Sequence, residues 1–151
     1  MENENVFMRI FETTQVLQRA LQSRLSVLQL PTEITGQRLR VLWEVSHAGS
    51  LRMSELASRM GVQPRTVTPF VDALETAGFV TRKSDPQDRR VTLLELTGKA
   101  RSVVEGFHQV VDGINGRIAG TVSFEDQRAL TSILGRIEAA MKEDAPDNSE
   151  N

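Results

Sequence analysis

Three residues at fixed spacing constrain the fold of this chain most strongly. Gly61 and Val67 follow Ala57 by four and ten residues, between two short stretches with apolar residues at helical spacing. At these positions a small residue lets two helices touch, a glycine permits a left-handed turn, and a branched residue fills the space between the helices. The pattern predicts a helix-turn-helix that starts near Ser54 and closes at Gly78.

A charged turn comes next in the chain. Residues 85–90, with the sequence Asp-Pro-Gln-Asp-Arg-Arg, separate two β-prone stretches, Phe79 to Ser84 and Val91 to Leu96. Aspartate and proline favour turns, and partial alternation of apolar and polar residues favours strands. We expect an antiparallel hairpin, or wing, whose tip carries two arginines.

The rest of the chain is expected to be helical. Helical spacing of apolar residues recurs in four further stretches, which are 6–28, 35–49, 97–118 and 123–141. Thr35 and Thr97 stand where N-caps belong, and Ser123 with Asp126 resembles a capping box. Residues 51–53 are expected to form a short strand. The predicted class is therefore mainly α with a small β-hairpin wing.

Composition argues against an enzyme. The 151 residues include no cysteine, which excludes disulfides and thiolate metal sites, and only two histidines, His47 and His108. There is no glycine-rich phosphate loop, and the paired acids Glu125/Asp126 and Glu143/Asp144 are adjacent, so their side chains diverge on a helix. We expect no catalytic residue, no metal and no cofactor.

The sequence also predicts a cytoplasmic protein. No apolar stretch reaches the roughly 18 to 20 residues that a membrane helix requires, and the first residues lack the basic start of a signal peptide. No membrane partner is expected.

The charge is divided along the chain. Residues 35–101 have a net charge of +4, whereas the remaining residues have a net charge of −6. A local basic field attracts phosphate and gives salt-dependent affinity, although a chance fluctuation of surface charge is the simpler alternative. Together with the helix-turn-helix, this division favours DNA as the partner.

The second helix of the pair holds the candidate base contacts, because the first residues of such a helix face the base edges in the major groove. These residues are Gln63, Arg65, Thr66 and Thr68. Arginine pairs with guanine, glutamine with adenine, and threonine with a thymine methyl or a phosphate. The alternative is an ordinary solvated helix start. Pro69 cannot donate to the carbonyl of Arg65, which predicts a bend in this helix.

Arginines at the hairpin tip suit a narrow, negative minor groove. Arg89 and Arg90 are the candidates, and Asp88 is expected to pair with Arg90 and fix its direction; a salt-bridged tip without a DNA role is the alternative. Four further basic residues are either phosphate contacts or plain surface charges. They are Arg38, Arg52, Arg82 and Lys83.

A family signature covers the hairpin and the residues around it. It consists of Leu74, Glu75, Gly78, Phe79, Val80, Arg82, Asp85, Pro86, Asp88, Arg89, Arg90, Leu94, Leu96 and Thr97. With this spacing the chain, over residues 5 to 143, resembles the MarR family of bacterial and archaeal transcription regulators. The resemblance favours Arg90 as the side chain inserted into the minor groove.

The resemblance implies a homodimer that binds double-stranded DNA. Its first and last helices would interleave, and each copy would place one winged lobe on a near-palindromic operator. It further implies a repressor, associated with the nucleoid when bound, that a small aromatic or anionic effector releases.

The predicted organisation is a single MarR-like domain over residues 1–151. It comprises dimerisation helices at 5–30 and 98–142, a winged helix-turn-helix lobe at 35–97 and an acidic flexible tail at 143–151. The long apolar stripes of the terminal helices exceed what a small winged domain buries alone, which independently favours a dimer.

Two sets of residues are candidates for an effector site. Gly106, Gly113, Gly116 and Gly120 interrupt an otherwise helical stretch, as expected for close helix crossing, for ligand space or for a merely weak helix. Trp43 and His47 lie one turn apart and either border a pocket or serve core packing and a helix C-terminus. The alternatives to a ligand-released repressor are a ligand-independent regulator and a winged-helix protein-interaction module.

Overall fold

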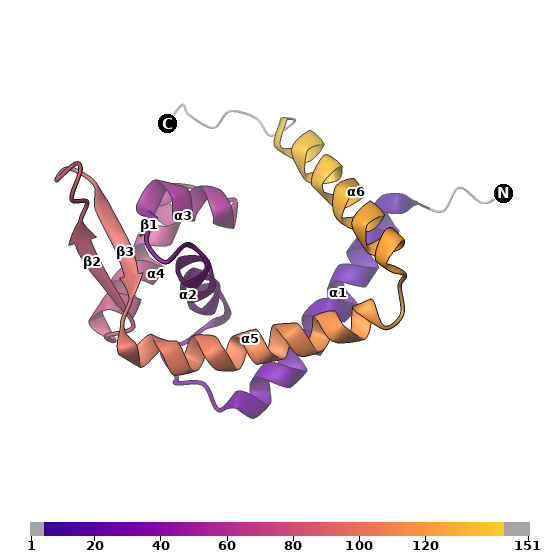
Figure 1. Cartoon of the computed structure of the whole chain (residues 1–151), viewed down its shortest axis with the longest axis horizontal. Helices are drawn as coiled ribbons and strands as arrows, with labels where there is room; N and C mark the ends of the chain where they lie inside the picture. Colours follow the sequence, from indigo (N-terminus) through magenta and orange to yellow (C-terminus); the bar gives the residue numbers. More distant parts are fainter. Residues whose placement is uncertain (1–4, 144–151) are drawn as a thin grey trace. The chain divides into compact units, whose positions relative to one another are not determined.

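The computed structural model describes residues 5–143, which form helices and one small sheet (Figure 1). The elements in chain order are α1 (Val6–Leu25), the 3-10 helix η1 (Ser26–Leu28), α2 (Gly36–Ala48), β1 (Leu51–Arg52), α3 (Met53–Met60), α4 (Pro64–Thr76), β2 (Val80–Ser84), β3 (Thr92–Leu96), α5 (Gly98–Ala119) and α6 (Phe124–Glu143). The chain divides into two compact units, Met1–Val111 and Asp112–Asn151, and the boundary falls inside α5. The acidic tail predicted at 143–151 lies outside the described residues except for Glu143.

Two of the three predicted N-caps are confirmed. The Thr35 hydroxyl accepts a hydrogen bond from the Arg38 amide at 3.5 Å, and the Ser123 hydroxyl accepts one from the Asp126 amide at 3.1 Å. Thr97 directly precedes α5, as predicted, but the bond that its hydroxyl makes is a donation to the carbonyl of Gly78 at 2.6 Å rather than acceptance from an amide of α5. A tertiary partner is thus preferred to the local one.

The helix predicted over 6–28 is shorter than expected. It ends as an α-helix at Leu25 and continues as a 3-10 turn to Leu28. Gln29 then adopts a left-handed conformation with φ of 47°, which stops the helix before Pro31. The difference is local, because 3-10 turns commonly close α-helices.

The helix-turn-helix is confirmed as α3 and α4. Gly61 ends α3 with φ of 69°, the left-handed conformation that glycine adopts without a steric penalty. The amide of Val62 donates to the carbonyl of Ala57 at 3.1 Å, closing the turn. Ala57 and Val67 are buried between the two helices, as their spacing predicts. The first helix begins at Met53, one residue earlier than expected.

The wing belongs to a three-stranded antiparallel sheet rather than a hairpin alone. The strand order is β1-β3-β2, with Leu51 opposite Leu94 and Val80 opposite Leu96. The predicted short strand therefore exists, and it pairs with the second strand of the wing. This pairing ties the start of α3 to the base of the wing.

One apolar core holds the first unit together. Side chains that are fully buried come from α2, α3, α4, the sheet and the residue before β2; they include Leu42, Val45, Leu56, Val67, Val71, Leu74, Phe79 and Leu94. Ala100, Val103, Val104 and Phe107 extend this core along α5. Gly106 faces Leu28, whose methyl carbons would lie 3.6 Å from an added Cβ, which is an ordinary van der Waals distance.

The second unit exposes much of its apolar surface. Helix α6 carries exposed large side chains, which are Phe124, Leu130, Ile133, Leu134 and Met141. In the first unit, the early turns of α1 likewise expose Val6, Phe7, Phe11 and Val16. Among residues 5–143, no helix is long and apolar enough to cross a membrane.

The turn glycine allows a direct test of the helix-turn-helix geometry. We expect Gly61→Ala to destabilise the fold by about 1 kcal/mol, because alanine is strained at positive φ while an added Cβ meets no neighbour within 4 Å. For a chain of this length that is a fall in Tm of roughly 2–4 °C.

Gly61→Asn is the matched control, since asparagine tolerates the left-handed conformation better than alanine. It should lose less stability in the same calorimetric measurement. Equal losses for both variants would contradict a conformational origin.

Candidate nucleic-acid interface

Helix α4, called the reading helix below, presents its predicted contact residues to solvent. Gln63 is its N-cap and Pro64 its first residue, and Gln63, Arg65, Thr66 and Thr68 are all exposed. On the opposite side Val67, Val71 and Leu74 are 0% exposed. Burial of one helix face therefore turns the polar face outward.

Pro69 does not interrupt the reading helix. The helix is continuous from Pro64 to Thr76, and Pro69 is exposed between the buried positions 67 and 71. The carbonyl of Arg65 loses its usual helical donor there. The Thr68 hydroxyl adds a local bond by donating to the Pro64 carbonyl at 3.1 Å, which occupies this side chain before any DNA contact.

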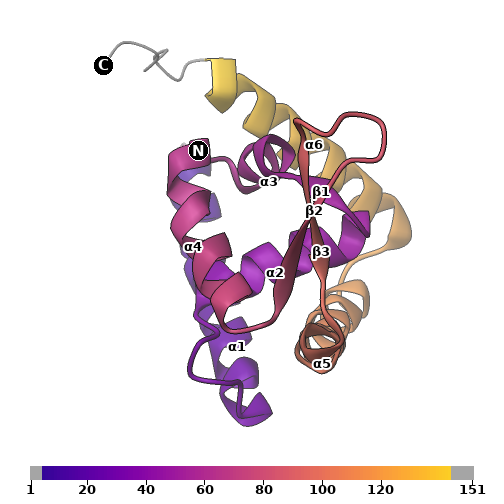
Figure 2. The ribbon, with the colours of Figure 1, turned by 90° about the vertical axis from the view of Figure 1, so that its left-hand side faces the viewer.

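A tight turn at 85–91 holds the tip of the wing, which projects beyond the strands in Figure 2. Backbone bonds close it, from the Asp85 amide to the Val91 carbonyl and from the Val91 amide to the Asp88 carbonyl, each at 2.9 Å. The Asp88 carboxylate accepts from the backbone amide of Arg90 at 3.0 Å. Asp88 therefore orients the backbone of Arg90, whereas the predicted partner was its guanidinium.

Asp85 anchors the base of this turn. It is 8% exposed, and its carboxylate accepts from the Gln87 amide at 2.8 Å and from the Arg52 guanidinium at 3.2 Å. The Gln87 amide is the largest cause of a lowered Asp85 pKa; burial acts against this shift, and Arg52 adds to it. This residue belongs to the predicted motif but had no predicted role; its signal is the Asp-x-x turn pattern, in which aspartate binds the amide two residues on.

Three of the four candidate phosphate residues are engaged in ion pairs. Arg52 pairs with Asp85, and Lys83 pairs with Glu95 across the hairpin. Arg82 binds two carboxylates of the reading helix, Asp72 at 2.6 Å and Glu75 at short range. Burial is the largest single influence on the pKa of Arg82 and lowers it, but the two acids together outweigh burial and raise the pKa.

The fourth candidate, Arg38, donates to the carbonyl of Glu33 at 2.7 Å. All four residues therefore have protein partners, and any phosphate contact remains a prediction. Arg82 in particular links the first strand of the wing to the reading helix, a role that sequence alone did not indicate.

The predicted base-reading and wing-tip arginines differ from these four. Within residues 5–143, no carboxylate forms an ion pair with Arg65, Arg89 or Arg90, and all three are exposed. In the described part of the chain, the arginines predicted to contact base edges and the minor groove are therefore not neutralised by a carboxylate.

The comparisons with known proteins agree with this geometry. The model of the MarR family matches residues 34–92, which span the helix-turn-helix and most of the wing. The transcriptional repressor MdtR of Bacillus subtilis is 32% identical over 118 residues, covering 76% of this chain and 74% of MdtR. The chain belongs to the MarR family.

Solved structures extend the likeness of this MarR-family chain to nearly its full length. A mutant MarR from E. coli complexed with operator DNA is 25% identical, with a TM-score of 0.71, covering 90% of this chain and 95% of that one. An uncharacterised regulator of B. subtilis, YdgJ, is 30% identical over 106 residues, or 70% of this chain, and the chain spans 65% of its length. The winged-helix fold is confirmed, and the relatives are transcriptional regulators, not enzymes.

The aromatic residues of α2 pack within the MarR-family lobe. The Trp43 ring meets that of Phe107 edge-on at 5.0 Å, and His47 Nδ1 lies 3.0 Å from the Trp43 carbonyl. These contacts match the structural interpretation of both residues. Trp43 also borders a cleft of about 600 Å³ between α1, α2 and α5, so a ligand role stays a prediction.

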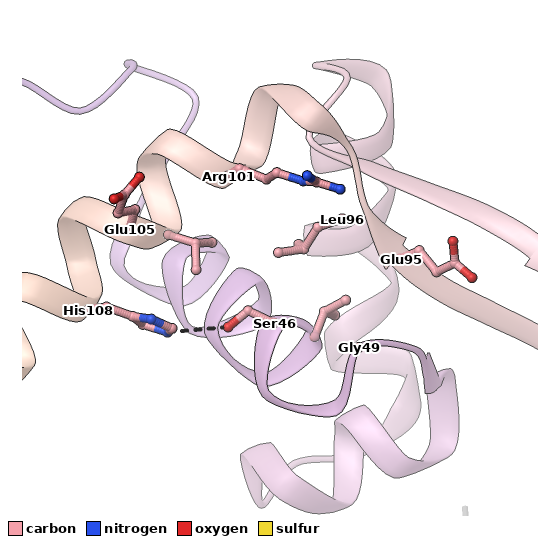
Figure 3. Close-up of a pocket in the computed structure, with 9 residues that line it drawn as sticks. Ser46, Gly49, Glu95, Leu96, Arg101, Glu105 and His108 are labelled. Carbon is pink, nitrogen blue, oxygen red and sulfur yellow. Dashed lines mark hydrogen bonds between the residues drawn. The ribbon is translucent and has the colours of Figure 1, made fainter.

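A second cavity of about 530 Å³ lies between α2, β3 and α5 (Figure 3). Val45, Leu96 and Val104 contribute apolar lining, while Arg101 and His108 come from one face of α5. His108 Nε2 lies 3.5 Å from the Ser46 hydroxyl. Within the described chain no three His, Asp or Glu residues are grouped to hold a metal ion.

The lowered pKa of Asp85 makes the wing pH-sensitive. Because the folded state favours the ionised carboxylate, Asp85 stabilises the fold above its unfolded pKa of about 3.9 and loses this effect as pH falls through its lower folded pKa. We expect Asp85→Asn to be less stable than the wild type at pH 7, with the difference shrinking below about pH 4.

Urea unfolding from pH 7 to about pH 3 measures this difference. Arg52→Gln is the companion variant, because it removes one favourable partner of Asp85 and leaves the Gln87 amide, which is the largest cause, so Asp85 should keep part of its pH-dependent effect. A gap between wild type and Asp85→Asn that stays constant with pH would contradict the assignment.

Proposed function

We propose that this chain is a sequence-specific DNA-binding repressor that acts as a homodimer on a near-palindromic operator. The observation that carries the proposal is that two neighbouring structural elements each present arginines that form no ion pair within residues 5–143. Arg65 projects from the reading helix, and Arg89 and Arg90 from the closed turn of the wing. A helix start suits the major groove and a basic tip suits the adjacent minor groove.

Charge supports the same proposal. Residues 35–101 are net positive within a chain whose formal net charge is −2, so the attraction to phosphate is confined to one region. Repression is supported by the identity of 32% to MdtR, which is a transcriptional repressor. Operator binding is supported by the likeness to MarR in its complex with operator DNA.

Release by a small aromatic or anionic effector is part of the proposal. The cleft between α1, α2 and α5 has an apolar lining from Leu21, Leu25, Trp43 and Phe107, and Arg40 also lines it. Its volume of about 600 Å³ lies within the usual range for small-molecule sites.

Selection of bound DNA fragments from the source genome tests DNA binding and identifies the operator in the same experiment. We expect enrichment of a near-palindromic sequence, with affinity that falls steeply as salt rises. No enrichment even at low salt would overturn the proposal and favour the protein-interaction module.

Substitution of the two arginines should change DNA binding in different ways. Arg65→Ala should weaken binding to the enriched duplex by about 1–3 kcal/mol and leave random DNA nearly unaffected, because it removes a base contact. Arg90→Ala should reduce the salt slope by about one unit if it neutralises a phosphate.

Titration of both duplexes across a salt series measures these effects. Lys142→Ala, on α6, is a matched control for loss of one surface cation and should change neither quantity. Equal losses of Arg65→Ala on operator and random DNA would reject base reading.

Exposed apolar side chains on the terminal helices predict the dimer. Phe11 is 49% exposed on α1 and Ile133 is 48% exposed on α6. In each unit the apolar side chains of the terminal helix are exposed to solvent, and a second copy of the chain would bury them. We expect Phe11→Glu and Ile133→Glu to shift the protein from dimer to monomer in sedimentation velocity experiments.

The control is Thr131→Glu, an exposed polar position on the same helix as Ile133, which should remain dimeric. A wild type that sediments as a monomer at micromolar concentration would contradict the proposed homodimer.

A further inference from the structure

The C-terminal end of the reading helix is hydrogen-bonded to residues at the start of α5. Gly78 ends the helix with φ of 78°, and two backbone bonds close the terminal turn, from Gly78 to the Glu75 carbonyl at 2.9 Å and from Phe79 to the Leu74 carbonyl at 2.8 Å. This is a Schellman motif, and it leaves the carbonyls of Ala77, Gly78 and Phe79 to find other donors.

All three carbonyls are bound by two residues at the start of α5. Lys99 Nζ donates to the Ala77 carbonyl at 2.8 Å. Thr97 donates twice, from its hydroxyl to Gly78 at 2.6 Å and from its amide to Phe79 at 3.0 Å. Three consecutive carbonyls that follow α4 thus accept hydrogen bonds from Thr97 and Lys99 at the start of α5.

The Lys99 side chain has a second contact that fixes its path. Its ammonium group lies 4.4 Å from the centroid of the Phe79 ring, and Phe79 is 1% exposed. A cation on the face of an aromatic ring is attracted by the ring quadrupole, and a cation at a helix C-terminus is favoured by the helix dipole. Lys99 meets both conditions although it is exposed to solvent.

These contacts tie the C-terminal end of the reading helix to the start of α5. Helix α5 is continuous from Gly98 to Ala119. The opposite end of α4 carries Arg65. A 13-residue helix is about 20 Å long, which separates Lys99 from the base-reading residues.

We propose that Lys99, supported by Thr97, is a positioning residue that sets the orientation of the reading helix relative to α5. The inference rests on the proposed DNA-binding function and deepens it. Lys99 acts through the end of α4 rather than through DNA, so its loss should reduce the preference for operator over random DNA without removing a phosphate contact.

The test compares Lys99→Met with Lys99→Arg. Methionine keeps most of the stem but removes the donor and the charge, whereas arginine keeps both. On the duplex enriched from genomic DNA, we expect Lys99→Met to bind on the order of fivefold more weakly, as typical for coupling between separate sites. Random DNA and the salt slope should stay unchanged, and Lys99→Arg should restore most of the affinity.

Two controls separate this role from simpler ones. Arg101→Gln removes a cation two residues further along α5 and should bind the enriched duplex like the wild type. Thr97→Val removes the hydroxyl donor with little change of shape and should weaken specific binding, whereas Thr97→Ser should not. Affinities are taken per folded protein, with folding checked by circular dichroism.

The outcomes are distinguishable. Failure of the wild type to enrich any duplex refutes the proposed function, whereas wild-type binding with an unchanged Lys99→Met refutes only this inference. A salt slope reduced by about one unit would show a direct phosphate contact instead. A lower Tm with unchanged affinity of the folded protein would show a role in stability alone.

Discussion

Burial of one face of α4 is the constraint on which the rest of the interface depends. Val67, Val71 and Leu74 are inaccessible to solvent because they pack into the core formed by α2, α3 and the sheet. A helix with one face buried has a fixed rotation about its axis. Arg65 consequently points outward, and the residues that follow the helix are hydrogen-bonded to the start of α5.

The basic residues of the lobe fall into two groups with different physical roles. Arg52, Arg82 and Lys83 each meet a carboxylate, and two of these pairs tie the wing to neighbouring elements. Such partly exposed pairs contribute little stability individually, but they define geometry. The unpaired arginines on the reading helix and wing tip are then available to a polyanion.

Local sequence signals predicted most of the fold correctly. The left-handed turn at Gly61, the N-caps at Thr35 and Ser123 and the wing strands depend on neighbours close in sequence. Predictions about side-chain partners were less successful. Thr97 binds Gly78 nineteen residues away, and Arg82 binds Asp72 ten residues away. Nothing in residue spacing distinguishes such a partner from a DNA phosphate.

The sequence by itself determined the class of fold, the family signature and the identity of the exposed cations, because periodicity, turn chemistry and motif spacing are local properties of the chain. Only the tertiary structure decided which cations are already neutralised and that the end of the reading helix is bound by Thr97 and Lys99. The physical reason is that hydrogen bonds and ion pairs depend on distances of about 3 Å. Packing of distant segments sets those distances.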